Sequence, residues 1–266
     1  MALYKAILAY DGTDFLGLQR QAQGRTVQGE IEASLRQLGW EEAAIRYAGR
    51  TDSGVHARGQ VIAFRLAWQH TPDALQKALN ALLPDDIVVH TVQPAPADFH
   101  PRYAALARRY VYHVSVAPQR DPFWRRYAWR VWPAPDPDAL AAAAALLEGR
   151  KDFAALGTPP NPHGTTVRTI YKARWTQLGA QAWAFDVVAD AFLYRMVRRM
   201  VALQIAVAQG RMALQALQEA LATPPPAPLQ GLAPPQGLFL EAVCYDEASL
   251  HQCVQAAPRW GGCPVG

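Results

Sequence analysis

Two periodicities of apolar residues alternate along the first hundred residues. Short apolar or alternating runs predict strands, and runs with an apolar residue every three or four positions predict helices. Thr26 and the Thr71-Pro72 pair are typical helix starts, and Gly39 is a typical helix end. The predicted elements are a strand over 3–10, a helix over 27–38, strands over 45–47 and 60–66, a helix over 72–82 and a strand over 87–92. Their order is β-α-β-β-α-β.

The same order begins again near residue 107. Tyrosine and valine alternate with polar residues over 109–116, which predicts a strand, and Asp136-Pro137 starts an alanine-rich helix. Proline-rich residues 224–235 predict a loop. The further elements are strands over 167–177 and 181–189, a long helix over 192–209, a shorter helix over 214–221 and a last strand over 238–245.

This repetition predicts an α/β (α+β) fold of two tandem ferredoxin-like β-α-β-β-α-β units with antiparallel sheets. Each sheet would bury one face under helices and leave the other free for a ligand. We expect an N-terminal domain over 1–104, a C-terminal domain over 105–246, and a loosely docked tail over 247–266.

Composition narrows the class of protein. The chain has 266 residues, 51% hydrophobic and 18% charged, enough to bury a core. No signal peptide and no apolar run of about eighteen residues is evident, so we expect a cytoplasmic protein with no membrane segment. Cys244, Cys253 and Cys263 form no C-x-x-C pair, and the seven histidines show no ligand spacing. We therefore expect no disulfide and no metal.

The charge is mildly basic, with a net value of +4 and a pI near 9.0. Of the 26 cationic residues 22 are arginine, whose guanidinium can hold phosphate through two parallel hydrogen bonds. This favours a polyanionic partner, although a coding preference for arginine would give the same composition.

The candidate catalytic residue is Asp52, in the loop 49–58 between two predicted strands. Gly49 and Gly54 bracket it, and the loop is longer than a tight hairpin needs. Taken alone, the string is also typical of a hairpin turn with a capping aspartate. Four neighbours would surround the carboxylate with positive charge and hydrogen bonds, namely Arg50, Thr51, His56 and Arg58.

An ionised carboxylate beside a nucleotide can act as a nucleophile toward C1′ or C6, or as a base that removes a sugar proton. The chemistry that fits the loop is therefore chemistry at a glycosidic bond.

Six ordered motifs spread over residues 3–245 resemble the TruA family of tRNA pseudouridine synthases. They are Tyr10-Asp11-Gly12-Thr13, Thr26-Val27-Gln28, Gly49-Arg50-Thr51-Asp52-Ser53-Gly54-Val55-His56-Ala57, Phe99-His100-Pro101-Arg102, Arg108-Arg109-Tyr110-Val111-Tyr112 and Phe192-Leu193-Tyr194-Arg195-Met196-Val197-Arg198. The chain departs from the family pattern at Ser53, Arg102, Ala202 and the pair Tyr194-Arg195.

The resemblance implies a homodimer that converts uridines 38, 39 and 40 of the tRNA anticodon stem-loop to pseudouridine without a cofactor. It implies that Asp52 is the catalytic aspartate, that Tyr110 stacks on the target base and that Arg198 pairs with the carboxylate. Arg50 is a second candidate partner, and Arg58 and His56 are candidate substrate contacts.

Two other classes of function stay open. A non-catalytic RNA-binding protein could use Tyr110, Tyr112 and the arginines as stacking and phosphate contacts. A nucleoside or glycoside hydrolase also places a carboxylate near an anomeric carbon, although such enzymes generally need two carboxylates.

Overall fold

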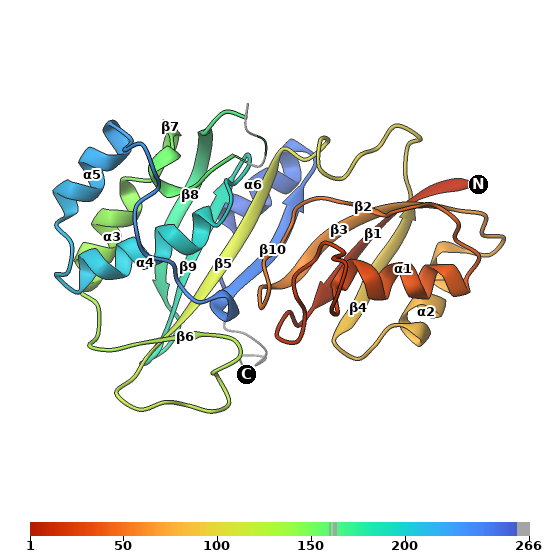
Figure 1. Ribbon diagram of the computed structural model, residues 1–266, viewed down its shortest axis with the longest axis horizontal. Coiled ribbons are helices and arrows are strands. Elements are labelled where there is room, and N and C mark those ends of the chain that lie inside the picture. Colours follow the sequence, from red (N-terminus) through yellow and green to blue (C-terminus); the bar gives the residue numbers. More distant parts are fainter. Residues whose placement is uncertain (160, 162–163, 260–266) are drawn as a thin grey trace. The chain divides into compact units, whose positions relative to one another are not determined.

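The computed structural model describes residues 1–159, 161 and 164–259 (Figure 1). The fold is mixed α/β with mostly antiparallel strand pairing. The chain forms two compact units. Unit 1 contains Met1–Leu106 and Phe239–Glu247, and unit 2 contains Ala107–Leu238 and the residues from Ala248 onward.

Unit 1 is a sheet in the order β4-β1-β3-β10, with β2 also on β3. The strands are β1 (Ala2–Tyr10), β2 (Arg46–Tyr47), β3 (His56–Leu66), β4 (Ile87–Pro94) and β10 (Leu238–Cys244). β1 pairs antiparallel with β3 and β4. β2 pairs antiparallel with β3 at Ile62 and Ala63, whereas β10 runs parallel to β3 and pairs with His56 and Ala57. β3 therefore pairs with β1 on one edge, and it pairs with β10 and β2 at two different positions along its length.

Two helices lie together on one face of this sheet, α1 (Val27–Gln37) and α2 (Pro72–Leu82) (Figure 1). The predicted caps are confirmed. The Thr26 hydroxyl accepts from the Gly29 N–H, and the Thr71 hydroxyl accepts from the Ala74 N–H. Each helix buries its apolar stripe, which includes Ile31 in α1 and Leu79 in α2.

Unit 2 contains a sheet in the order β5-β9-β8-β7, with the short β6 parallel to β5. The strands are β5 (Ala107–Val116), β6 (Trp129–Val131), β7 (Gly149–Asp152), β8 (Val167–Gln177) and β9 (Ala182–Ala189). The helices are α3 (Pro137–Ala145), α4 (Met196–Ala208), α5 (Leu214–Ala222) and α6 (Glu247–Gln255), with 3-10 turns η1 (Ala154–Leu156) and η2 (Pro235–Gly237). Asp136 caps α3, as expected from the sequence.

Two predicted boundaries are wrong. The strand expected from residue 60 begins at His56, because β10 pairs with His56 and Ala57 and Tyr10 of β1 also pairs with Ala57, residues that sequence alone assigned to the loop. The helix expected from residue 192 begins at Met196. Arg195 precedes it in the left-handed region with φ 59°, and the Tyr194 N–H donates to the Thr158 carbonyl. These contacts hold the chain out of helical geometry.

The end of the chain also differs from expectation. Residues 238–245 contain the expected last strand, and Phe239–Glu247 belongs to unit 1, whereas the domain boundaries at 104 and 246 stay a prediction. The tail expected over 247–266 begins with helix α6. The Ala256 carbonyl behind α6 accepts hydrogen bonds from Arg109 and Lys172, which docks this segment on unit 2. A patternless sequence can still fold where such partners are available.

Each sheet was expected to leave one face free. At β5 no face is free, because residues 109–114, whose side chains alternate between the two faces, are all buried. None of the helices among the described residues is long and apolar enough to cross a membrane. Cys244 and Cys253 are buried, and Cys263 lies outside the described residues.

Candidate active site

Asp52 lies in unit 1 on a turn between β2 and β3, and it is partly exposed. The Val55 N–H donates to the Asp52 carbonyl at 3.1 Å, which closes the turn around Ser53 and Gly54. Gly54 has φ 76°, a conformation that favours glycine at this point of a turn. The Gln60 side chain donates to the Gly49 carbonyl at 2.9 Å and fixes the other end of the loop.

A second segment, residues 11–18, lies directly against this loop. The Leu18 N–H donates to the Thr51 carbonyl at 3.1 Å, and the Ser53 hydroxyl donates to the Phe15 carbonyl at 3.1 Å. A β-carbon on Gly12 would lie 2.0 Å from the Val55 oxygen, and one on Gly17 would lie 2.7 Å from the Thr51 oxygen. Glycine is required at both positions because backbone meets backbone there. The Ser53 bond shows that this departure from the family pattern adds an anchor.

Tyr10 connects the loop to the core. Its hydroxyl lies 2.8 Å from the Thr51 hydroxyl, and the Gln60 amide donates to it at 3.5 Å. Burial raises the pKa of Tyr10 to about 12, so the phenol stays protonated and available for hydrogen bonding at neutral pH. Thr51 precedes Asp52 directly. Tyr10 is thus a positioning residue for the carboxylate.

We expect Tyr10→Phe to lower turnover about tenfold and stability by about 1 kcal/mol, because one buried hydrogen bond is removed while the ring stays. Steady-state kinetics and urea unfolding measure the two effects. Tyr47→Phe, on the half-buried β2, is the matched control. Equal kcat for Tyr10→Phe and the native chain would remove Tyr10 from the positioning role.

His56 and Arg58 are tied to β10 within unit 1. His56 is 1% exposed, and its ring stacks on Phe239 with centroids 4.5 Å apart. Its Nδ1 accepts from the Gly12 N–H at 3.0 Å and lies 3.1 Å from a carboxylate oxygen of Asp11. Arg58 donates to Glu241 at 2.9 Å and lies over the Phe239 ring. Both side chains therefore help to fix the start of β3.

Arg50 is exposed on the same loop. Asp52, Arg50, His56 and Arg58 thus all lie in unit 1, on one loop and the strand that follows it. The hydrogen bonds between this loop and residues 10–18 were missed from the sequence, where Tyr10-Asp11-Gly12-Thr13 appears only as a family motif.

Tyr110 and Arg198 belong to unit 2. The Tyr110 ring is 8% exposed and meets Phe192 edge to face at a centroid distance of 5.1 Å. Arg198, in the first turn of α4, is 9% exposed, and its Nε donates to the Ala233 carbonyl at 2.8 Å. The neighbouring Arg199 donates to the Leu229 and Leu156 carbonyls, and burial lowers its pKa. Arg198 and Arg199 are therefore largely shielded from solvent, whereas Arg195 is exposed. Arg198 is the residue that the resemblance pairs with the carboxylate. Its role toward Asp52 stays a prediction.

Other departures from the family pattern lie at or near the protein surface. Tyr194 is 52% exposed and lies under the guanidinium of Arg195, and the half-buried Arg102 lies near the Tyr103 ring. Within the described part of the chain, no cluster of three or more His, Cys, Asp or Glu side chains is placed to hold a metal ion.

Comparison with known proteins identifies the family. A family model described as tRNA pseudouridine synthase matches residues 6–104 and 143–246. The tRNA pseudouridine synthase A of a Geobacillus species is 42% identical over 244 residues, covering 91% of this chain and 98% of that protein. The protein of the same description from Chloroflexus aurantiacus is 40% identical over 262 residues, covering 96% and 93%.

Among solved structures, a chain of a Cbf5-Nop10-Gar1 complex is 12% identical with a TM-score of 0.39, covering 89% of this chain and 48% of that chain. The likeness is too distant to bear on function. The family match and the near full-length relatives decide the assignment: the chain belongs to the TruA family of tRNA pseudouridine synthases, which are isomerases.

Proposed function

We propose that this protein converts uridine to pseudouridine at positions 38, 39 and 40 of the tRNA anticodon stem-loop, with Asp52 as the catalytic carboxylate and no cofactor. The observation that carries the proposal is the placement of Asp52. It is partly exposed on a turn that Phe15 and Leu18 hold through hydrogen bonds. Thr51, the residue before it, is hydrogen-bonded to the Tyr10 hydroxyl.

The reaction rearranges one nucleotide. The C1′–N1 bond breaks, the uracil turns within the site, and C5 bonds to C1′. The proton on C5 is released and N1 gains a proton, so no net atoms enter or leave the RNA. An ionised Asp52 can attack a carbon of the nucleotide as a nucleophile, or it can remove the 2′ proton as a base. A rigid turn favours either step, because the carboxylate is oriented before the substrate arrives.

The remaining site residues fall into two groups. Tyr110 would stack on the flipped base, and Arg198 or Arg50 would pair with the Asp52 carboxylate. For His56 we propose a positioning role instead of a substrate contact, since its ring is buried and bonded to Gly12. Arg58 fits either role, because its guanidinium is partly exposed while paired with Glu241.

The proposal extends to the assembly and the fold. We propose a homodimer whose chains each contain two ferredoxin-like repeats. The order β1-α1-β2-β3-α2-β4 and the antiparallel pairing of β3 between β1 and β2 support this for the first repeat.

The test is release of tritium from tRNA that carries uridine labelled at C5. The native chain should release the label to water. Apart from the label, the RNA mass should not change, since the proton lost from C5 is balanced by the proton that N1 gains. Transcripts with cytidine at 38, 39 and 40 together should release none. Loss of uracil from the RNA would instead indicate a hydrolase, and binding without release would indicate an RNA-binding protein.

A further inference from the structure

Arginine and aromatic residues are concentrated in unit 2, on the segment that joins β5 to β6. Residues 120–132 contain four arginines and five aromatic residues, with Asp121 as the only acidic residue. The segment falls between the two parts of the chain that match the family model. None of the candidate active-site residues belongs to it.

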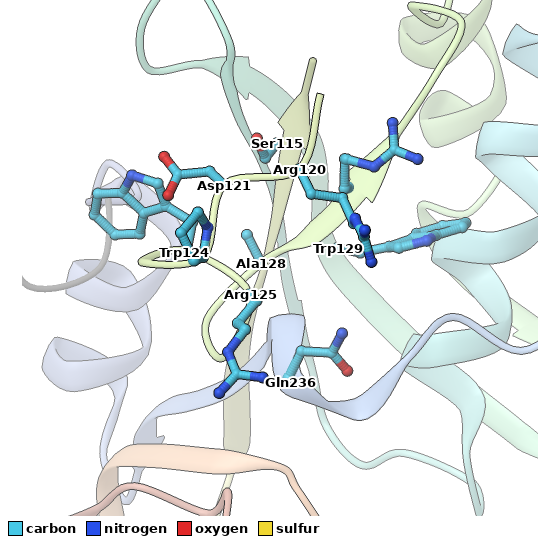
Figure 2. A pocket seen from close by; sticks show the side chains of 10 residues that line it. Ser115, Arg120, Asp121, Trp124, Arg125, Ala128, Trp129 and Gln236 are labelled. Atoms are coloured by element: carbon cyan, nitrogen blue, oxygen red, sulfur yellow. The ribbon is translucent and has the colours of Figure 1, made fainter. Parts of the chain in front are cut away.

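The segment forms a pocket of about 500 Å³ (Figure 2). Arg120, Trp124, Arg125 and Trp129 line it, and Ser115 of β5 and Gln236 of η2 complete the wall. Ligand pockets in proteins have volumes of about 300–1,000 Å³, so the space suits one small molecule or one nucleotide.

The pocket is held in place by its own backbone. Arg130 donates to the Ala117 and Pro118 carbonyls at 3.1 Å, which fixes the end of the segment to its beginning. The Tyr127 and Ala128 N–H groups both donate to the Trp124 carbonyl, and β6 pairs Trp129 with Val114 of β5. The pocket is thus formed before any ligand binds, which lowers the cost of binding.

Two guanidinium groups are available to a ligand. Arg120 and Arg125 are exposed, and neither side chain has a hydrogen-bond or ion-pair partner among the described residues. Asp121 also lines the pocket, where its carboxylate accepts from the Phe123 N–H at 2.8 Å, so three arginines, Arg120, Arg125 and Arg130, face one carboxylate there. The pocket therefore offers unsatisfied positive charge beside the partly exposed indole rings of Trp124 and Trp129.

Arginine beside exposed indole is the combination that binds single-stranded nucleic acid, since guanidinium groups hold phosphate and aromatic rings stack on bases. An acidic peptide would satisfy the arginines but would leave the indole planes without a matching group. A nucleotide satisfies both at once.

We propose that this pocket binds an unpaired nucleotide of the substrate tRNA, with its phosphate on Arg120 and Arg125 and its base against Trp124 or Trp129. The inference rests on the proposed action on tRNA and adds a binding point for a nucleotide other than the reacting uridine. Its effect is on binding and not on the chemical step.

The first test is the double variant Arg120→Ala/Arg125→Ala. The Kd for full-length tRNA should rise about tenfold or more near physiological salt, and the salt slope should fall by about one for each phosphate that the variant no longer binds. In turnover assays KM should rise while kcat at saturating tRNA stays within about twofold. Arg150→Ala, an exposed arginine of β7, is the matched control and should change none of these values.

The second test separates stacking from folding. Trp124→Ala should weaken tRNA binding about tenfold, and Trp124→Phe should restore most of it, because any aromatic ring supports a stacked base. The melting temperature of each variant is measured alongside. Unchanged Kd and KM in the arginine variant, or a fall in kcat alone, would overturn the pocket while the native chain still released tritium. Absence of release by the native chain would instead contradict the proposed function.

Discussion

Replacing Asp52 with asparagine should reduce tritium release from tRNA by about 10³-fold or more, with little change in tRNA affinity. Asparagine keeps the shape of the side chain but supplies neither a nucleophilic oxygen anion nor a base. Removal of such a group costs about 10²–10⁴-fold in general acid–base catalysis and more where the group also forms a bond. The turn should persist, because the hydrogen bond from the Val55 N–H that closes it reaches the backbone carbonyl of Asp52 and not its carboxylate.

The matched control is Asp85→Asn, which removes an exposed carboxylate from unit 1 and should leave turnover unchanged. Binding of tRNA is measured for both variants, so that weaker binding and a slower chemical step are distinguished. Normal turnover by Asp52→Asn would contradict the mechanism, whatever the affinity. Equal loss of turnover in both variants would point to general electrostatics in place of a single catalytic group.

Elements with local signals could be predicted from the sequence. Thr26, Thr71 and Asp136 each cap a helix through a side-chain oxygen and a backbone N–H three or fewer residues away. The strand β8 and the start of α5 also lie where hydrophobic periodicity predicts them. Such features depend on residues close in sequence, so the chain records them locally.

Elements defined by distant partners could not be predicted. The first residues of β3 pair with β10 from the far end of the chain and, at Ala57, with Tyr10 of β1. Arg58 likewise donates to Glu241, 183 positions away. The short strand β6 contains only three residues and depends on its parallel partner β5. The helix α6 shows no clear apolar stripe, yet the Ala256 carbonyl behind it meets Arg109 and Lys172.

The candidate site divides in the same way. The family motif identifies Asp52, but the reasons for its geometry come from Tyr10, Gly12 and Gly17, which precede the loop by about forty residues. The sequence alone does not show which backbone segment packs closely against a given glycine. The close approach of Gly12 to Val55 is visible only in three dimensions.

The largest expected effect on stability is that of Asp186→Ala in unit 2. This carboxylate is fully buried and accepts from Arg109 Nε and Nη2, both at 2.9 Å, and from Lys172 at 2.7 Å. Its removal leaves two cations in the protein interior without their counter-charge. Breaking a buried ion pair in this way costs about 3–5 kcal/mol. We therefore expect the free energy of unfolding of Asp186→Ala, measured in urea, to fall by about that amount.

The effect should extend to Tyr110, which we propose stacks on the target base, because Arg109 directly precedes Tyr110 on β5 and also donates to Ala256. An uncompensated Arg109 would shift this strand and release the segment behind α6, so protease cleavage near the C-terminal end should accelerate in Asp186→Ala. Glu219→Ala removes an exposed carboxylate of α5 and should change stability by less than about 0.5 kcal/mol. The double variant Asp186→Leu/Arg109→Leu tests whether unpaired buried cations cause the loss of stability. It leaves one unpaired cation fewer than Asp186→Ala, so it should recover part of the stability. A fall below about 1 kcal/mol in Asp186→Ala would mean that water reaches the two cations and that the cluster does not hold α6.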